Sequence, residues 1–132
     1  MKNNIECKVQ LLDLYFSKFS FVQKERSDNS EYTSSFKIGY STNKNDKTQV
    51  KITIDSFIKN KDEKLVVDLQ TIGIFKIDSD GIDLDEYNQL IKANTVAIIF
   101  PYIRSQISLI TTQPGVTPIM IPPINFSSLA ES

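Results

Sequence analysis

The sequence predicts one α+β domain over residues 1–132: a four-stranded antiparallel meander sheet, then two to three helices packed on one face. Residues 8–77 alternate apolar and polar side chains with the two-residue period of strands, and short polar turns interrupt them. Over about 83–130, apolar residues first recur every three or four positions, as on helices, and then enter a proline-rich loop. The chain has 132 residues and is 40% apolar, which is enough for one core.

The first strand should be long and irregular. Within residues 8–22 the apolar positions change parity between Phe16 and Phe19. A change of parity places successive apolar side chains on one face only if an extra residue is inserted. The pattern therefore predicts a bulge near Ser17 and Lys18.

The second and third strands alternate regularly. After a polar loop at residues 24–31, one strand is centred on residues 36–40 and the next on residues 50–55. Residues 43–47 between them are rich in Asn, Asp and Lys, which favours a hairpin turn.

A second polar turn, residues 60–63, leads to the fourth strand, residues 65–77. Its apolar positions change parity near Gly73, and a glycine inside a strand often marks a bulge. We therefore expect the fourth strand to be bulged at this glycine.

Helical signals begin at Asp83. Asp83 and Glu86 have the spacing of a capping box, which predicts a first helix over about 84–92. Asn94 or Thr95 is a candidate cap for a second, longer helix.

The longer helix should continue to about Ile110, and Pro101 lies inside its apolar pattern. A proline there either bends the helix or starts it. Residues 114–123 contain four prolines and should form an extended apolar loop, and Asn125 can cap a last short helix through Leu129.

The charges are unevenly distributed. The 15 basic and 16 acidic residues give a net charge of −1, but only Arg104 and Glu131 lie in residues 94–132. Such an apolar segment must be buried in the fold, covered by a partner, or kept exposed for binding. An apolar loop in particular suggests contact with something.

Composition excludes several classes of function. There is no histidine and only one cysteine, Cys7, which removes Ser-His and Cys-His catalysis and the usual zinc or haem sites. The balanced charge offers no footprint for nucleic acid, and the four glycines are too far apart for a phosphate-binding loop. We expect no cofactor, no metal and no enzymatic activity.

Two acidic alternatives stay in view. The segment 78–86 is rich in aspartate, but its glycine is displaced from the calcium-loop position, and acids that lead into a helix explain it better. A small hydrolase with two carboxylates needs two acids that converge in a cleft, and no spacing singles out such a pair.

Nothing in the sequence suggests a membrane. Residues 1–8 lack the apolar core of a signal peptide, and the longest apolar run, Val96 to Ile103, is too short to span a bilayer. We expect a cytoplasmic protein without direct membrane insertion.

Three motifs resemble the SecB family of protein-export chaperones. They are Gly73-Ile-Phe75, Phe100-Pro-Tyr-Ile-Arg104 and Pro122-Pro-Ile-Asn-Phe126, where the family has GIF, FPYAR and APVNF. The resemblance extends over roughly residues 8–130.

The resemblance implies an ATP-independent chaperone that holds unfolded polypeptides, among them preproteins for the Sec pathway. It also implies a homotetramer, a dimer of dimers with long helices between two eight-stranded sheets. By position, Ile99, Ile103 and Ile107 would lie at that oligomer interface.

The client-binding groove of the family maps onto the second strand and the proline-rich loop. The corresponding residues are Phe36, Ile38, Tyr40, Val116, Ile119, Ile121 and Ile124. All are apolar or aromatic, so we expect this part of the function to be preserved.

The docking face for the SecA motor matches less well. By position, Val66 and Asp68 would belong to it, but Lys18 and Val22 stand where the family has acids. A chaperone dedicated to one partner, such as an antitoxin of a toxin–antitoxin system, is the alternative to general export.

Overall fold

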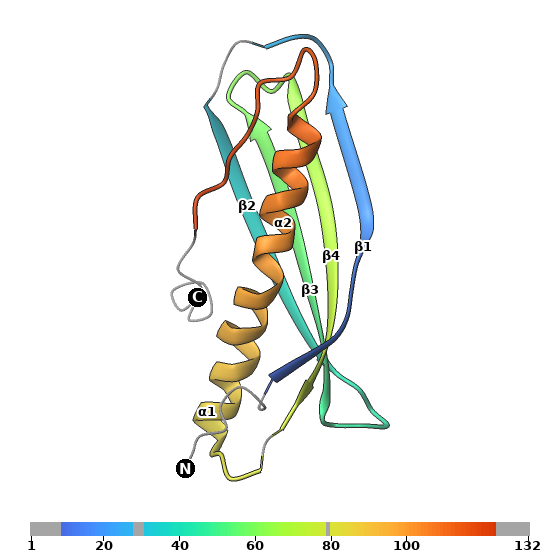
Figure 1. Ribbon diagram of the computed structural model, residues 1–132, viewed down its shortest axis with the longest axis vertical. Helices are drawn as coiled ribbons and strands as arrows, with labels where there is room; N and C mark the ends of the chain where they lie inside the picture. Colours follow the sequence, from blue (N-terminus) through green and yellow to red (C-terminus); the bar gives the residue numbers. More distant parts are fainter. Residues whose placement is uncertain (1–8, 28–30, 79, 124–132) are drawn as a thin grey trace.

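A computed structural model of the chain describes residues 9–27, 31–78 and 80–123. Four long strands form one twisted sheet, and a single helical layer lies across one of its faces (Figure 1). The strands are β1 (Val9–Gln23), β2 (Tyr32–Thr42), β3 (Gln49–Asn60) and β4 (Leu65–Ile77), and the helical segments are α1 (Leu84–Gln89), η2 (Leu90–Asn94) and α2 (Thr95–Thr111). The predicted α+β class, with the helices on one face, is confirmed.

The strand order is β1-β4-β3-β2, with every neighbouring pair antiparallel. Strands β2 to β4 form the predicted meander, but β1 lies beside β4 and not beside β2. β4 is apolar on both faces, with Val66, Ile72 and Ile74 on the side away from the helices. Apolar residues on both faces are typical of strands in the interior of a sheet. The edges of the sheet are therefore β1 and β2.

The bulges lie on β1. Its register with β4 shifts between Leu11 and Asp13 and again between Phe16 and Lys18, so the bulge predicted near Ser17 is confirmed and a second one lies at Leu12. The bulge predicted at Gly73 is wrong, because β4 stays in register with β3 through this residue.

Gly73 has a different purpose: it lets α2 approach the sheet. The buried row of β4 continues through Thr71, Gly73 and Phe75 without a change of parity. A Cβ atom at Gly73 would lie only 2.7 Å from the Ile99 Cδ1 atom and 2.9 Å from the Phe75 ring. The missing side chain at Gly73 thus makes room for Ile99 of α2 against β4.

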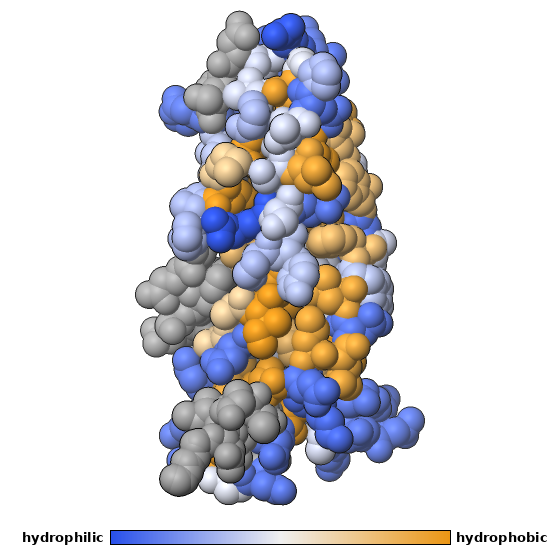
Figure 2. All heavy atoms as spheres, viewed as in Figure 1, coloured by the Kyte–Doolittle hydropathy of each residue, from blue (hydrophilic) through white to orange (hydrophobic). Residues whose placement is uncertain are grey.

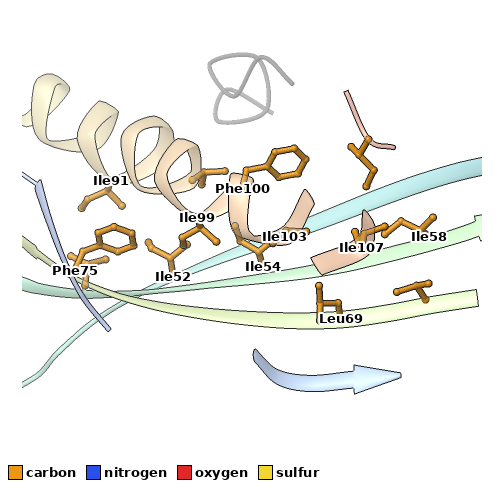
Figure 3. Close-up of a cluster of buried hydrophobic side chains, with 14 of the residues drawn as sticks. Ile52, Ile54, Ile58, Leu69, Phe75, Ile91, Ile99, Phe100, Ile103 and Ile107 are labelled. Carbon is orange, nitrogen blue, oxygen red and sulfur yellow. The ribbon is translucent and has the colours of Figure 1, made fainter. Parts of the chain in front are cut away.

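The core lies between the sheet and α2. In Figure 3, Ile99, Ile103 and Ile107 point from α2 toward the sheet, where they meet isoleucines such as Ile52 and Ile54 of β3. All five side chains are at most 1% exposed. The helical period of α2 and the two-residue period of β3 together build this layer.

The helical segments are continuous rather than two separately capped helices. The Asp83 carboxylate accepts a hydrogen bond from the backbone N–H of Glu86 at 2.8 Å, as the capping box predicts. Asn94 makes no capping bond, and Thr95 lies within the helix with its hydroxyl donating to the Ile91 carbonyl. A π-helical turn, η2, joins α1 to α2, so the cap predicted at Asn94 or Thr95 is wrong.

Pro101 lies inside α2, on its exposed side. The helix does not begin there, so of the two predicted alternatives the internal position is correct. The predicted short helix at residues 125–129 lies outside the described residues. Among the residues that the structure describes, no helix is long and apolar enough to cross a membrane.

Candidate functional site

The face of β2 that looks toward the helices carries three of the predicted site residues. Phe36, Ile38 and Tyr40 alternate with exposed Lys37 and Gly39, and β2 is an edge strand. Phe36 and Ile38 are half-buried against the core, whereas the Tyr40 side chain is 38% exposed. We call these three residues the β2 seam.

Two aromatic side chains of β2 contact the helical layer, one at η2 and the other at α2. The Tyr40 hydroxyl donates to the Lys92 carbonyl of η2 at 3.4 Å. The Phe36 ring stands edge-on to that of Phe100 in α2, with centroids 5.3 Å apart. Burial raises the pKa of Tyr40, so its hydroxyl stays protonated and remains a donor.

The segment after α2 follows β2 as an extended loop, residues 112–123 (Figure 1). Its side chains alternate: Ile119 and Ile121 are only 4% and 5% exposed, while Met120 between them is 70% exposed. Pro118 and Pro122 frame this stretch, and proline restricts its own backbone and that of the residue before it to extended forms.

Hydrogen bonds from side chains fasten this loop. The Arg104 Nε atom donates to the Ile121 carbonyl at 2.8 Å, and the Thr111 hydroxyl accepts from the Ile119 N–H at 2.9 Å. The Tyr32 hydroxyl donates to the Met120 carbonyl at 3.2 Å. The loop therefore behaves as a strap tied to α2 on one side and to β2 on the other.

The predicted loop residues are consequently placed in the core of the chain. Ile119 and Ile121 belong to the same buried cluster as the helix and sheet, and Val116 packs partly against it. Ile119 and Ile121 therefore present little surface to a ligand unless the strap lifts. Ile124, the seventh predicted residue, lies outside the described residues.

An open groove runs between the outer side of α2 and the strap. Its volume is about 490 Å³, and its walls are Pro101, Arg104, Ser105, Ser108, Leu109, Thr112, Met120 and Ile121. Leu109 and Met120 are 69% and 70% exposed, so apolar surface is available here without any movement. Figure 2 shows further apolar side chains gathered over the lower half of this face and along the edge formed by β1.

The sequence-based list of site residues did not include Leu109 or Met120. Two signals could have found them. Leu109 follows Tyr102, itself 50% exposed, by seven residues and so lies on the same outer side of α2. Met120 has the opposite parity to two isoleucines in an extended, proline-framed segment.

The predicted oligomer-interface residues are not at a surface. Ile99, Ile103 and Ile107 are 0% exposed in the single chain, because they pack on its own sheet (Figure 3). They have no area left to bury against another copy, and that assignment is wrong for these three side chains.

The predicted docking residues Val66 and Asp68 point away from the helices, on the outer face of the sheet. The Asp68 carboxylate is paired with the Lys18 ammonium of β1 at 3.0 Å. This pair neutralises the acid that a cationic partner would contact.

We looked in the groove for the carboxylates of a hydrolase and, among the described residues, for a group of metal ligands. The wall of the groove has no carboxylate, which is what a two-carboxylate hydrolase would need there. Within the described residues, no group of three or more acidic or cysteine side chains is arranged to hold a metal ion.

Comparisons with known proteins place this arrangement in a family. The family model described as preprotein translocase subunit SecB matches residues 3–132. The protein-export protein SecB of Rickettsia rickettsii is 33% identical over 82 residues, which is 61% of this chain and 53% of that protein. An uncharacterised protein of Methanocaldococcus jannaschii is 32% identical over 94 residues, 70% of this chain and 59% of that protein. The chain thus spans somewhat more than half the length of the curated relatives it matches.

Solved structures agree on the fold. The SecB-like chaperone of Mycobacterium tuberculosis, in complex with a ChAD peptide from the HigA1 antitoxin, superposes with a TM-score of 0.73 at 12% identity. The match covers 91% of this chain and 93% of that one. With a family model that matches nearly every residue and a fold that agrees, this chain belongs to the SecB family.

Proposed function

We propose that this protein is an ATP-independent chaperone that holds unfolded polypeptides on the helical side of its sheet. The observation that carries the proposal is the groove beside α2, where Leu109 and Met120 expose apolar surface. Membership of the SecB family supports the same conclusion.

Burial of apolar side chains supplies the binding energy. Each square ångström of apolar surface removed from water contributes about 25 cal/mol, and ordering an extended chain cancels much of it. A single groove would therefore hold a client weakly. Several grooves on one oligomer would act together and raise the overall affinity.

Movement of the strap would enlarge the apolar surface available to a client. When it lifts, Ile119 and Ile121 leave the core and extend the apolar surface of the groove toward Phe36 and Ile38. In this proposal the residues expected from the sequence form a second, inducible part of the site. Val116 would extend it along the strap, and Ile124 stays a predicted client-binding residue.

The test is suppression of aggregation of a chemically denatured client. Met120→Glu combined with Tyr40→Glu should abolish suppression, because both side chains are exposed and can be changed without opening the core. Leu84→Glu is the matched control, since Leu84 is 71% exposed but lies on α1, outside the groove. ATP should make no difference. Equal suppression by the double variant and the wild type would place the client elsewhere.

We further propose that the clients include preproteins for Sec export in the cytoplasm. A SecA-type motor would have to dock on Val66 and Asp68 of the outer face and displace Lys18 from the Asp68 carboxylate. Lys18→Ala should then strengthen SecA binding in a surface plasmon resonance assay, and Asp68→Asn should weaken it. No response to either change would argue against this docking site.

The second candidate is a chaperone dedicated to one partner. Two observations favour it: the outer face has a neutralised acid at Asp68, and a solved relative was captured with an antitoxin peptide. Affinity purification from the native host should then recover one partner in a fixed ratio, encoded beside this gene. Recovery of many unrelated precursor proteins would favour general export.

A further inference from the structure

Four lysines gather at one end of the outer face of the sheet. Lys44 and Lys47 lie in the hairpin between β2 and β3, Lys51 on β3 and Lys76 on β4. Lys51 and Lys76 point outward, because they alternate with buried residues on both strands. The register places Gln49 opposite Lys76 and Lys51 opposite Ile74, so the two lysines occupy adjacent rows. We call the four lysines the basic corner.

Four lysines elsewhere in the chain have acidic partners. Lys18, Lys59, Lys61 and Lys64 each form an ion pair with an aspartate or glutamate. In the described part of the chain, no carboxylate lies within ion-pair distance of the basic corner.

Three acids lie near the corner: Asp46 in the hairpin, Asp13 on β1, and Asp78, which follows the end of β4. The Asp46 carboxylate is engaged by the side chain and backbone of Thr48, at 2.5 and 3.0 Å. These bonds, with a smaller contribution from Lys76, lower the pKa of Asp46. Asp13 stands opposite Ile74 on β1. The four lysines still exceed these three carboxylates by one charge.

A pocket opens among these lysines. It has a volume of about 200 Å³ and is lined by Ser41, Asn43, Gln49, Val50, Lys51 and Ile74. Ile74 supplies the apolar surface, because Val50 is only 1% exposed, and the other four residues form a polar rim. The volume is sufficient for one aliphatic side chain.

The rim of the pocket is held in a defined shape. The backbone N–H of Asn43 donates a hydrogen bond to the Gln49 carbonyl at 3.0 Å. The backbone N–H of Gln49 donates to the Asp46 carbonyl, also at 3.0 Å. The Ile77 N–H donates to the Thr48 carbonyl at 2.7 Å, which fastens the hairpin to the end of β4. The hairpin stands out as a hydrophilic projection at the lower right of Figures 1 and 2.

We propose that the basic corner docks an acidic segment of a partner polypeptide, whose carboxylates face the lysines while one aliphatic side chain enters the pocket. Charge complementarity decides the sign of the partner, and the apolar floor of the pocket favours a peptide over a nucleic acid. The corner has no arginine and no aromatic side chain, the residues that read phosphates and stack bases.

This surface is separate from the proposed client site. The groove and the β2 seam lie on the helical side of the sheet, whereas Lys51, Lys76 and Ile74 lie on the opposite side. A partner bound at the basic corner would leave the client site open. The proposal is independent of the chaperone assay and can succeed or fail without it.

Binding should be weak and should fall as salt rises. Each exposed ion pair contributes little to the affinity, and salt screens it. Reversing two lysines should therefore weaken binding about tenfold.

The test is fluorescence anisotropy with a short fluorescein-labelled peptide that alternates glutamate and leucine. The wild-type chain should bind it in low salt, and the Lys51→Glu/Lys76→Glu variant should bind about tenfold more weakly. Lys37→Glu is the matched control, because Lys37 also lies exposed on the outer face but outside the pocket. Met120→Glu tests the client site and should leave this affinity unchanged.

Ligand variants separate the two parts of the recognition. A peptide with glutamine in place of glutamate should bind weakly, and so should one with serine in place of leucine. Equal loss in Lys37→Glu and in the double variant would overturn the proposal. So would tighter binding of a single-stranded DNA of equal charge, which would assign the corner to nucleic acid. A fall in oligomer mass in the double variant would assign the corner to a second copy of this chain and would likewise overturn it.

Discussion

Gly73 makes room on β4 for Ile99 of α2, and no larger residue fits without movement. An added Cβ would lie 2.7 Å from the Ile99 side chain, whose fully buried position leaves it little freedom to shift. The motif that contains Gly73 therefore has a packing reason as well as a family resemblance.

Gly73→Ala should lower the free energy of unfolding by about 1–3 kcal/mol, the usual cost of overpacking a core. Gly39→Ala is the control, since a Cβ there would be 4.0 Å from the nearest atoms. Urea denaturation followed by circular dichroism measures both. If the two variants prove equally stable, the contact between α2 and β4 is looser than described.

Two buried threonines differ only in their hydrogen bonds. Thr71 and Thr111 are both 0% exposed. Among the described residues, the Thr71 hydroxyl has no hydrogen-bond partner, whereas that of Thr111 donates to the Ile107 carbonyl and accepts from the Ile119 N–H. Burying an unpaired hydroxyl is costly, and removing a paired one leaves its partners unsatisfied.

The same substitution should consequently have opposite effects at these two positions. Thr71→Val should raise the free energy of unfolding by about 1 kcal/mol, and Thr111→Val should lower it by about 1–3 kcal/mol. Thermal and urea unfolding provide the measurement. A loss of stability in Thr71→Val would mean that its hydroxyl is in fact bonded.

At the scale of elements, the strap depends on α2. Arg104 is one of only two charged residues in residues 94–132, and its side chain is used to hold the loop through the Ile121 carbonyl. A bond from a charged donor is worth about 1.5–3 kcal/mol, more than a neutral one. Arg104 should therefore govern how often the strap opens.

Arg104→Met should speed hydrogen exchange of the Ile119 amide at least about tenfold, because it removes this bond and keeps the aliphatic stem. Tyr32→Phe, which removes an exposed bond to the Met120 carbonyl, should have a smaller effect. Exchange measured by nuclear magnetic resonance distinguishes the two. Unchanged exchange in Arg104→Met would show that the buried isoleucines alone hold the strap.

At the scale of the whole molecule, β1 is an edge strand with four large apolar side chains exposed. Leu12, Tyr15, Phe19 and Val22 are 43%, 46%, 46% and 47% exposed. Exposed apolar edges invite pairing with another copy. The homotetramer that we propose would cover this edge by joining two sheets, and its interface would lie here rather than at the buried isoleucines of α2.

Sedimentation should therefore give about 60 kDa, four times the 15.0 kDa of one chain. Phe19→Glu should reduce this mass, while Phe57→Glu should preserve it, because Phe57 is similarly exposed at 41% but lies on the central strand β3. A wild-type monomer at micromolar concentration would contradict the assembly. Equal masses for the two variants would move the interface away from β1.

The sequence by itself determined the type of nearly every element. Two-residue and three-to-four-residue periods mark strands and helices locally, and they placed the bulge at Ser17 and the cap at Asp83 correctly. Short motifs indicated the SecB family, which the comparison with the family model confirmed. The sequence also led us to predict that the apolar residues of β2 and of the strap form one client-binding group.

Only the tertiary structure decided which neighbour covers each face. The helical period indicates that Ile99, Ile103 and Ile107 share one side of a helix. It does not indicate whether that side packs on the chain's own sheet or on a partner. In the structure, that side packs on the sheet. Likewise, β1 pairs with β4 and not with β2, and pairing over such long sequence separations leaves no local trace. Gly73 lies opposite Ile99 for the same reason: contact between distant segments depends on packing, which a local pattern does not contain.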